Sequence, residues 1–235
     1  METLDDLTLF NLQLFQPRQG YRYSLDPLLL ARFCQKVKPV GSIIDLGAGC
    51  GIISLVLARI NADSSVVAVE NNREMAQLIE RNIQHNGLAD RVSKRVEDVI
   101  QLRNSYSDST FDLVVANPPF RRPGTGKISP RAGRDSARHE TTAGLSDFLA
   151  AAKYLVKPSG RICFIHLPSR LAEFLSLASS MKISLLRLRM VHNNAGSPAT
   201  MFMAEFAKGR FSEPVVEPPL LVRGADGHYT DEIWR

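Results

Sequence analysis

The sequence predicts an α/β protein built on a mainly parallel sheet that is covered by helices on both faces. Between residues 42 and 168, short apolar runs rich in β-branched residues alternate with segments of helical spacing. Strands that alternate with helices favour parallel neighbours, because each helix carries the chain back across the sheet. Two more strand-like runs follow with no helix between them, which predicts an antiparallel pair at one edge.

The expected elements follow one another regularly along the chain. Strands are predicted over residues 42–47, 64–70, 91–99, 111–120, 161–168, 183–191 and 200–209. Helices are predicted over residues 51–60, 72–85, 146–157 and 169–180. Another helix is expected to begin near Asp26 and Pro27, because proline suits the first helical turn. We therefore expect three parts, an N-terminal cap (1–35), the sheet domain (36–210) and a C-terminal extension packed on that domain (211–235).

The composition is that of an ordinary globular protein with a slight basic excess. The chain has 235 residues, of which 44% are hydrophobic, and a net charge of +5. No apolar run approaches the ~20 residues of a membrane helix, and the acidic start does not resemble a signal peptide. Three cysteines without metal-binding spacing indicate a reducing compartment and no structural metal. We expect a cytoplasmic protein without a membrane segment.

A glycine-rich loop follows the first predicted strand. Glycines at such a turn let the backbone approach a ligand, and the next helix directs its free N–H groups there. The dinucleotide fingerprint requires a third glycine where this chain has Ile52, so the loop favours a nucleoside with a methionine tail, S-adenosylmethionine, over a dinucleotide. The predicted cofactor-binding residues here are Asp45, Gly47, Ala48, Gly49 and Gly51.

Acidic residues close the next two predicted strands. Glu70 lies about 20 residues after the loop, where a carboxylate can bind both ribose hydroxyls, and Asn71 follows it. Asp98 closes the third strand, where it can accept from an adenine amino group. Each acid alone is more typical of a solvated loop, and a glycine loop alone is often a plain turn. Together they lie at the edge where open α/β sheets bind ligands.

The fourth strand ends in Asn117, Pro118, Pro119 and Phe120. A conjugated amino group is a poor nucleophile, because its lone pair is delocalised. The Asn117 side chain and the Pro118 carbonyl can accept its two hydrogens and direct the lone pair at a methyl group. Phe120 can stack on a planar base. An isolated Asn-Pro pair more often forms a turn. Here the pair follows an apolar strand, so we predict that all four residues take part in catalysis. Asn117 is also predicted to lie beside the cofactor.

The segment directly after this motif is strongly basic. Residues 121–140 contain six basic and two acidic residues, a net charge of +4. A solvated loop is the alternative, but its position beside the motif favours contacts with RNA phosphates. The predicted nucleic-acid-binding residues are Arg121, Arg122, Lys127, Arg131, Arg134 and Arg138. His139 and His166 are interpreted as structural, since the chemistry above needs no strong base.

These motifs resemble the class I S-adenosylmethionine-dependent methyltransferases that act on adenine N6 or glutamine N5. The sequence is most similar to the bacterial family that methylates adenosine N6 beside the anticodon of a valine tRNA. Three further stretches carry this resemblance, YRYSLDPLLLARF (21–33), ARHETTAGLSDFL (137–149) and LLVRGADGHYTDEIW (220–234). It implies a seven-stranded sheet of order 3-2-1-4-5-7-6 with strand 7 antiparallel, a tRNA partner, and cofactor roles for Tyr23 and Asp26. The family usually has Gly-Thr-Asp where this chain has Ser24-Leu25-Asp26.

Other functions share parts of this pattern. The same pocket would suit a guanine N2 amino group in ribosomal RNA, adenine N6 in DNA or a glutamine amide in a protein. Two alternatives lie outside the methyltransferases. A non-catalytic nucleotide-binding module is disfavoured by the intact Asn117–Phe120 motif, and a nicotinamide dehydrogenase is disfavoured by Ile52. The oligomeric state is left open.

Overall fold

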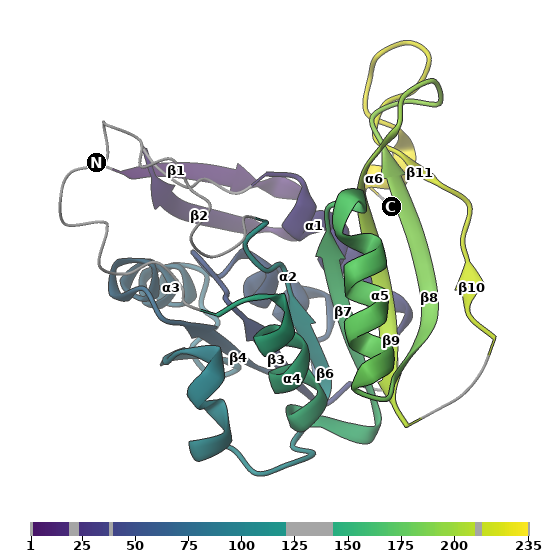
Figure 1. Cartoon of the computed structure of the whole chain (residues 1–235). Coiled ribbons are helices and arrows are strands. Elements are labelled where there is room, and N and C mark those ends of the chain that lie inside the picture. Colours follow the sequence, from purple (N-terminus) through teal and green to yellow (C-terminus); the bar gives the residue numbers. More distant parts are fainter. Residues whose placement is uncertain (1, 19–23, 38–39, 121–142, 210–212, 235) are drawn as a thin grey trace, which may run out of the picture.

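The computed structural model describes residues 2–18, 24–37, 40–120, 143–209 and 213–234 (Figure 1). Its strands are β1 (Glu2–Leu7), β2 (Leu12–Pro17), β3 (Ser42–Leu46), β4 (Ser65–Glu70), β5 (Val92–Val96), β6 (Phe111–Ala116), β7 (Val156–His166), β8 (Ile183–His192), β9 (Ala199–Lys208), β10 (Val215–Val216) and β11 (Leu220–Leu221). Its α-helices are α1 (Asp26–Phe33), α2 (Ile52–Ile60), α3 (Arg73–His85), α4 (Leu145–Leu155), α5 (Leu171–Ser180) and α6 (Asp231–Trp234). Short 3-10 helices are η1 (Thr8–Phe10), η2 (Cys34–Lys36), η3 (Val99–Asn104) and η5 (Pro168–Arg170).

The large sheet is mixed, as the sequence predicts. Its strand order is β10-β8-β9-β7-β6-β3-β4-β5, and β11 also pairs with β8. Strands β3 to β7 are parallel, whereas β9 runs antiparallel to both β7 and β8. Counted along the chain, the seven long strands stand in the order 3-2-1-4-5-7-6. The short strands β10 and β11 extend this sheet beyond the seven expected strands.

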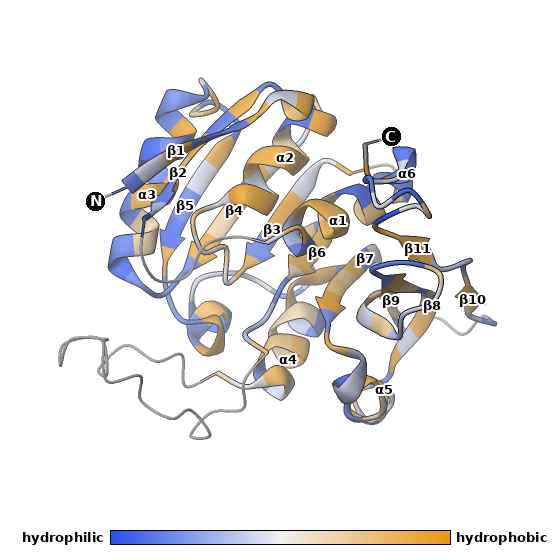
Figure 2. Ribbon diagram, turned by 90° about the horizontal axis from the view of Figure 1, so that it is seen from above, coloured by the Kyte–Doolittle hydropathy of each residue, from blue (hydrophilic) through white to orange (hydrophobic). Residues whose placement is uncertain are grey.

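The sheet separates two apolar cores. One core holds α1, α2 and α3 against one face, and the other holds α4 and α5 against the opposite face. Successive residues of β3 enter different cores, with Ile43 in the first and Ile44 in the second, because side chains alternate along a strand. Figure 2 shows the resulting band of hydrophobic strands between two helical layers. The central strands therefore read as continuous apolar runs rather than alternating ones.

Several element boundaries differ from the prediction, and β6 ends at Ala116 rather than at residue 120. Strand β5 ends at Val96, because Asp98 caps η3 by accepting a hydrogen bond from the Ile100 amide at 3.0 Å. Strand β7 begins at Val156 rather than residue 161 and passes through Gly160. A Cβ atom on Gly160 would lie 2.7 Å from the Asp112 carbonyl oxygen, so only glycine allows β6 to approach there. The prediction placed residues 156 and 157 in the preceding helix, which ends at Leu155.

The N-terminal segment contains a β-hairpin that the sequence analysis does not predict. Strands β1 and β2 pair antiparallel from Glu2–Pro17 to Leu7–Leu12 and form a separate two-stranded sheet. The inward residues Leu12 and Leu14 are buried against the α2 and α3 side of the molecule. An isolated hairpin has little stability of its own, so this packing must hold it in place.

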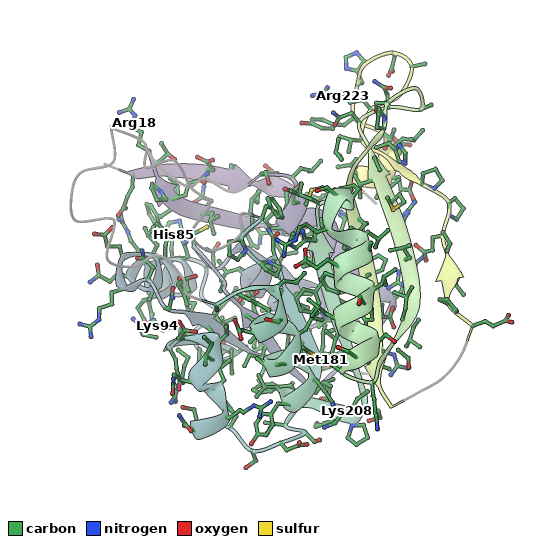
Figure 3. All side chains as sticks on the ribbon, in the orientation of Figure 1. Arg18, His85, Lys94, Met181, Lys208 and Arg223 are labelled. Atoms are coloured by element: carbon green, nitrogen blue, oxygen red, sulfur yellow. The ribbon has the colours of Figure 1, made fainter. Side chains whose placement is uncertain are left out.

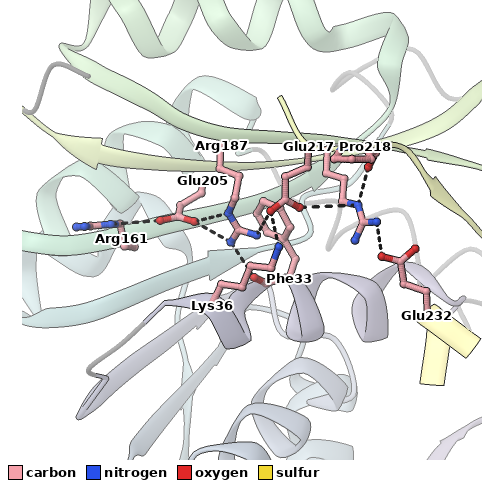
Figure 4. A network of polar contacts seen from close by, with 9 residues as sticks. Phe33, Lys36, Arg161, Arg187, Glu205, Glu217, Pro218 and Glu232 are labelled. Carbon is pink, nitrogen blue, oxygen red and sulfur yellow. Dashed lines mark hydrogen bonds and ion pairs between the residues drawn. The ribbon is translucent and has the colours of Figure 1, made fainter. Parts of the chain in front are cut away.

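A buried polar network joins the C-terminal segment to the sheet (Figure 4). The Arg187 guanidinium on β8 contacts Glu205 at 2.7 Å and Glu217 at 3.4 Å, and it donates to the Phe33 carbonyl at 2.8 Å. Lys36 forms an ion pair with the same Glu217 carboxylate. Because each buried charge has a partner, loss of one member would leave another uncompensated. The network thus ties β10 and its flanking residues to η2, β8 and β9.

Candidate active site

A cavity of about 600 Å³ opens at the carboxyl ends of β3, β4 and β6. Ligands of open α/β sheets bind at this edge, because the loops after parallel strands meet there. The cavity is lined by Gly47, Gly49, Val69, Glu70, Asn71, Asn72, Met75, Glu97, Val99, Asn117, Pro118, Pro119, Phe120 and Phe148. The structure therefore brings together the glycine loop, the acid at the end of β4 and the motif after β6, which lie far apart in the sequence.

The glycine loop adopts a conformation that other residues would resist. Gly47, Gly49 and Gly51 have φ angles of 73°, 59° and 88°. A Cβ atom on Gly47 would also lie 3.3 Å from the Phe148 ring. The amides of Gly47 and Ala48 donate to the Val69 carbonyl, which ties the loop to β4. Of the predicted loop residues, Gly47 and Gly49 line the cavity, whereas Ala48 and Gly51 do not.

Glu70 is the most constrained acid of the cavity. Its side chain is 9% exposed, its Oε2 accepts from the Gly49 amide at 2.8 Å, and its Oε1 accepts from the Asn72 amide at 2.9 Å. Burial raises the pKa of this carboxyl, and these amides oppose that rise. Each carboxylate oxygen can accept a second hydrogen bond. Glu70 can therefore hold the glycine loop and still bind two ligand hydroxyls.

Asp45 lies beneath the loop rather than on the cavity wall. It is fully buried, and the Ser54 hydroxyl donates to its Oδ2 at 2.7 Å, while its Oδ1 has no hydrogen-bond partner. Burial raises the pKa of Asp45 to about 7. The side chain is thus placed to support the start of α2, one layer behind the residues that face the cavity.

At the end of β5 the predicted cofactor residue Asp98 lies between two residues that line the cavity, and its role stays a prediction. Asp98 caps η3 and does not line the cavity, whereas Glu97 and Val99 do. The Glu97 carboxylate accepts from Arg95 and Ser105, each at 2.7 Å. A shift of one residue at a strand end reverses the direction of the side chain, and no local signal in the sequence fixes that position.

Phe148, Met75 and Asn72 also line the cavity, and none of them was selected from the sequence. Phe148 on α4 is buried, and Met75 at the start of α3 is partly buried. Asn72 caps α3, because its Oδ1 accepts from the Glu74 and Met75 amides. Asparagine before an amphipathic run is a helix-start signal, so only Asn72 could have been found from the sequence.

The acceptor end of the cavity is formed by the residues after β6. The Asn117 Oδ1 atom is buried and has no hydrogen-bond partner. A buried acceptor without a donor is costly, so its presence on a cavity wall indicates a ligand donor. Phe120 lies nearby on the same wall. These are the two side chains that the sequence analysis selected for the target amino group and its ring.

His166 packs directly against Phe120. The two rings meet edge to face with centroids 5.4 Å apart. His166 is fully buried, and its Nδ1 accepts from the Leu167 amide at 2.8 Å, which places the proton on Nε2. Burial lowers the pKa of this imidazole to about 4, so it is neutral at pH 7. His166 is therefore a buried, neutral side chain that packs against Phe120 on the cavity wall.

Several predicted site residues are not placed by these findings. Tyr23, His139 and the six basic residues between Arg121 and Arg138 lie outside the described residues. Asp26 begins α1, where it accepts from the Ser24 hydroxyl, and it does not line the cavity. In the described part of the chain, no three His, Cys, Asp or Glu side chains cluster as a metal site. Among those same residues no helix is long and apolar enough to cross a bilayer.

Comparison with known proteins identifies the family. The model of the methyltransferase small domain matches residues 26–195, most of the chain. The chain belongs to this methyltransferase family. A tRNA1(Val) (adenine(37)-N6)-methyltransferase of Salmonella arizonae is 31% identical over 220 residues, which cover 91% of this chain and 85% of the relative. The Shigella dysenteriae enzyme of the same name is 31% identical over 219 residues.

Solved methyltransferases share the fold of this family member. A predicted O-methyltransferase from Agrobacterium tumefaciens superposes with a TM-score of 0.72 at 20% identity, covering 88% of this chain and 93% of that one. The protein aTrm5, solved in complex with tRNALeu, gives a TM-score of 0.62 at 17% identity, covering 88% of this chain and 53% of that one. These likenesses agree with the class I fold expected from the sequence.

The chain is an S-adenosylmethionine-dependent methyltransferase, and the residues of its cavity fit that cofactor. Val69, Val99 and Phe148 offer apolar walls to a flat base. The two Glu70 oxygens can accept from ribose hydroxyls, and the glycine loop leaves room for the backbone to approach the methionine tail. The Asn117 oxygen without a partner belongs to a residue of this same cavity wall.

Proposed function

We propose that this enzyme methylates N6 of an adenosine in tRNA, next to the anticodon. The observation that carries the proposal is the buried, unpartnered Oδ1 of Asn117 on the wall of the cavity. An exocyclic amino group supplies the missing donor. The curated relatives, named for adenine N6 at position 37 of tRNA1(Val), support adenine and tRNA as the acceptor. An enzyme of this kind is expected to work in the cytoplasm.

Within this proposal the protein prepares the amino group for attack. The Asn117 Oδ1 and the Pro118 carbonyl each accept one amino hydrogen, which turns the nitrogen lone pair toward the methyl group. S-adenosylmethionine supplies that methyl group on a sulfonium ion. As the nitrogen–carbon bond forms, the carbon–sulfur bond breaks and sulfur keeps its electron pair. The positively charged amine then loses a proton to water, so the neutral His166 need not act as a base.

Phe120 is expected to contribute mainly to acceptor binding. Loss of one stacked base contact costs ~1–3 kcal/mol, so Phe120→Ala should raise the KM for RNA roughly 5- to 150-fold. Phe120→Tyr retains the ring and should stay close to wild type. Steady-state kinetics with unmodified valine tRNA measure this difference. Equal KM values for Phe120→Ala and wild type would remove Phe120 from the acceptor site.

The basic segment is proposed to bind the RNA backbone. Each neutralised phosphate steepens the fall of log affinity with log salt by about 0.7–0.9. Neutralising Arg121, Arg122 and Arg131 together should therefore flatten the slope by roughly two to three units. Filter binding of unmodified valine tRNA at several salt concentrations gives both slopes.

Methylation of a free adenine nucleoside, where detectable, is the internal control for these three substitutions, since it depends on the cavity alone. An unchanged salt slope would mean that the segment is merely solvated, and the RNA path would have to be sought elsewhere. If the wild type bound no tRNA and methylated a glutamine amide, the RNA acceptor would be wrong while the amino-methyltransferase would stand.

A further inference from the structure

The hairpin is attached to α3 through two side-chain amides. The Phe15 amide donates to Asn82 Oδ1 at 2.7 Å, and Asn82 Nδ2 donates back to the Phe15 carbonyl at 3.0 Å. Gln13 forms the same pair with Asn86, at 2.9 and 2.7 Å. Along the free edge of β2, each asparagine side chain thus makes the two backbone hydrogen bonds that a neighbouring strand would make. Figure 3 shows the labelled His85 of this helix beneath the hairpin, and its ring also contacts the Gln13 side chain.

The spacing of these residues explains the match. Residues four apart on a helix rise about 6 Å along one face, and alternate residues of a strand are about 6.7 Å apart. Asn82 and Asn86 can therefore face Phe15 and Gln13 together. This contact is invisible to strand patterns, because the partner of β2 at this edge is a helix surface.

Asn82 has a further partner that Asn86 lacks. Its Nδ2 also donates to the Cys50 carbonyl at 2.9 Å, inside the glycine loop between Gly49 and Gly51. Asn82 is fully buried and Cys50 is 5% exposed, so water has little access to this contact. The other bonds of Asn86 go to the Asn82 carbonyl and to Arg59. Of the two asparagines, only Asn82 joins the hairpin to the loop.

We propose that Asn82 is a positioning residue for the cofactor loop and couples hairpin docking to cofactor binding. A loop of glycines with positive φ resists displacement only where outside groups hold its backbone. Glu70 holds the Gly49 amide, and Asn82 holds the next carbonyl, that of Cys50. Without Asn82 this carbonyl is a buried acceptor without a donor, and the loop must shift to satisfy it. The inference rests on the proposed use of this cavity by the cofactor.

Matched variants separate this role from simple anchoring of the hairpin. Asn82→Leu and Asn86→Leu each remove one amide pair with β2, so both should lower the melting temperature. Only Asn82→Leu should also lower the affinity for S-adenosylhomocysteine, by roughly tenfold. The affinity of Asn86→Leu, measured by calorimetry, should stay within about twofold of wild type. Equal losses of affinity in the two variants, or none in Asn82→Leu, would overturn the proposal.

A measurement on the unaltered protein guards against misfolding of a variant. Because coupling between sites is reciprocal, bound S-adenosylhomocysteine should slow exchange of the Phe15 amide hydrogen more than that of Gln13. Residue-resolved amide exchange by NMR shows this directly. A Phe15 amide that responds no more than that of Gln13 would contradict the coupling.

Glu70→Ala tests the cavity itself. If this variant also left the affinity for S-adenosylhomocysteine unchanged, the cofactor site and not merely the role of Asn82 would be wrong.

Discussion

Replacing Asn117 by alanine is expected to lower the rate of methyl transfer by ~10²–10³-fold, because it removes an acceptor aimed at developing positive charge. Affinity for S-adenosylhomocysteine should remain nearly unchanged, since the orphaned Oδ1 awaits a donor that we assign to the acceptor base. A loss confined to kcat is the mark of a contact made in the transition state. Single-turnover assays with saturating tRNA and labelled cofactor measure that rate.

The control for this substitution keeps the oxygen in place. Asn117→Asp retains an acceptor at Oδ1 and should preserve more activity than alanine. Calorimetry with S-adenosylhomocysteine on both variants shows whether the cavity itself is intact. A near-normal turnover of Asn117→Ala on the true substrate would refute the role proposed for Asn117, even if all other residues behaved as expected.

Loss of the Glu70 carboxylate should have the largest effect on cofactor affinity. Two charge-assisted hydrogen bonds to ribose contribute ~1.5–3 kcal/mol each. Glu70→Ala should therefore lower the affinity for S-adenosylhomocysteine by at least about a hundredfold. The variant also removes the acceptor of the Gly49 and Asn72 amides, which loosens the glycine loop. Glu70→Gln should be intermediate, because its amide group would face one of these backbone donors.

Glu97→Ala is the matched control for Glu70. Its carboxylate also lies at the cavity, but its charge is already paired with the Arg95 guanidinium, whereas the Glu70 carboxylate accepts from backbone amides. Calorimetry should therefore show a clearly smaller loss for Glu97→Ala. Tight binding of NAD by the wild type, with no response to S-adenosylhomocysteine, would contradict the cofactor assignment as a whole.

The parts of the site found from the sequence are those with strong local signals. The glycines at 47, 49 and 51 are required by their positive φ angles, and the prolines after Asn117 end β6. The order of strands and helices could be predicted from the spacing of apolar residues. Buried parallel strands are apolar throughout, whereas helices place apolar residues three or four positions apart.

The parts that were missed depend on contacts between distant residues or on a single-residue position. The hairpin is held by Asn82 and Asn86, which lie 67 and 73 residues beyond their partners along the chain, and no pattern within residues 2–17 encodes them. The sequence pattern does not fix where β5 ends, so it could not show that the Glu97 side chain lines the cavity. Asp45 was expected at the cofactor, but its burial under the loop follows from the packing of α2 on β3.

The central claim is that the methyl group reaches an adenine N6 in tRNA. The purified enzyme, unmodified valine tRNA and methyl-labelled S-adenosylmethionine suffice to test it, with mass spectrometry of the digested RNA. We expect N6-methyladenosine next to the anticodon, formed ~10²–10³-fold more slowly by Asn117→Ala. Label on guanine N2, on a protein glutamine or nowhere in the tRNA would contradict it.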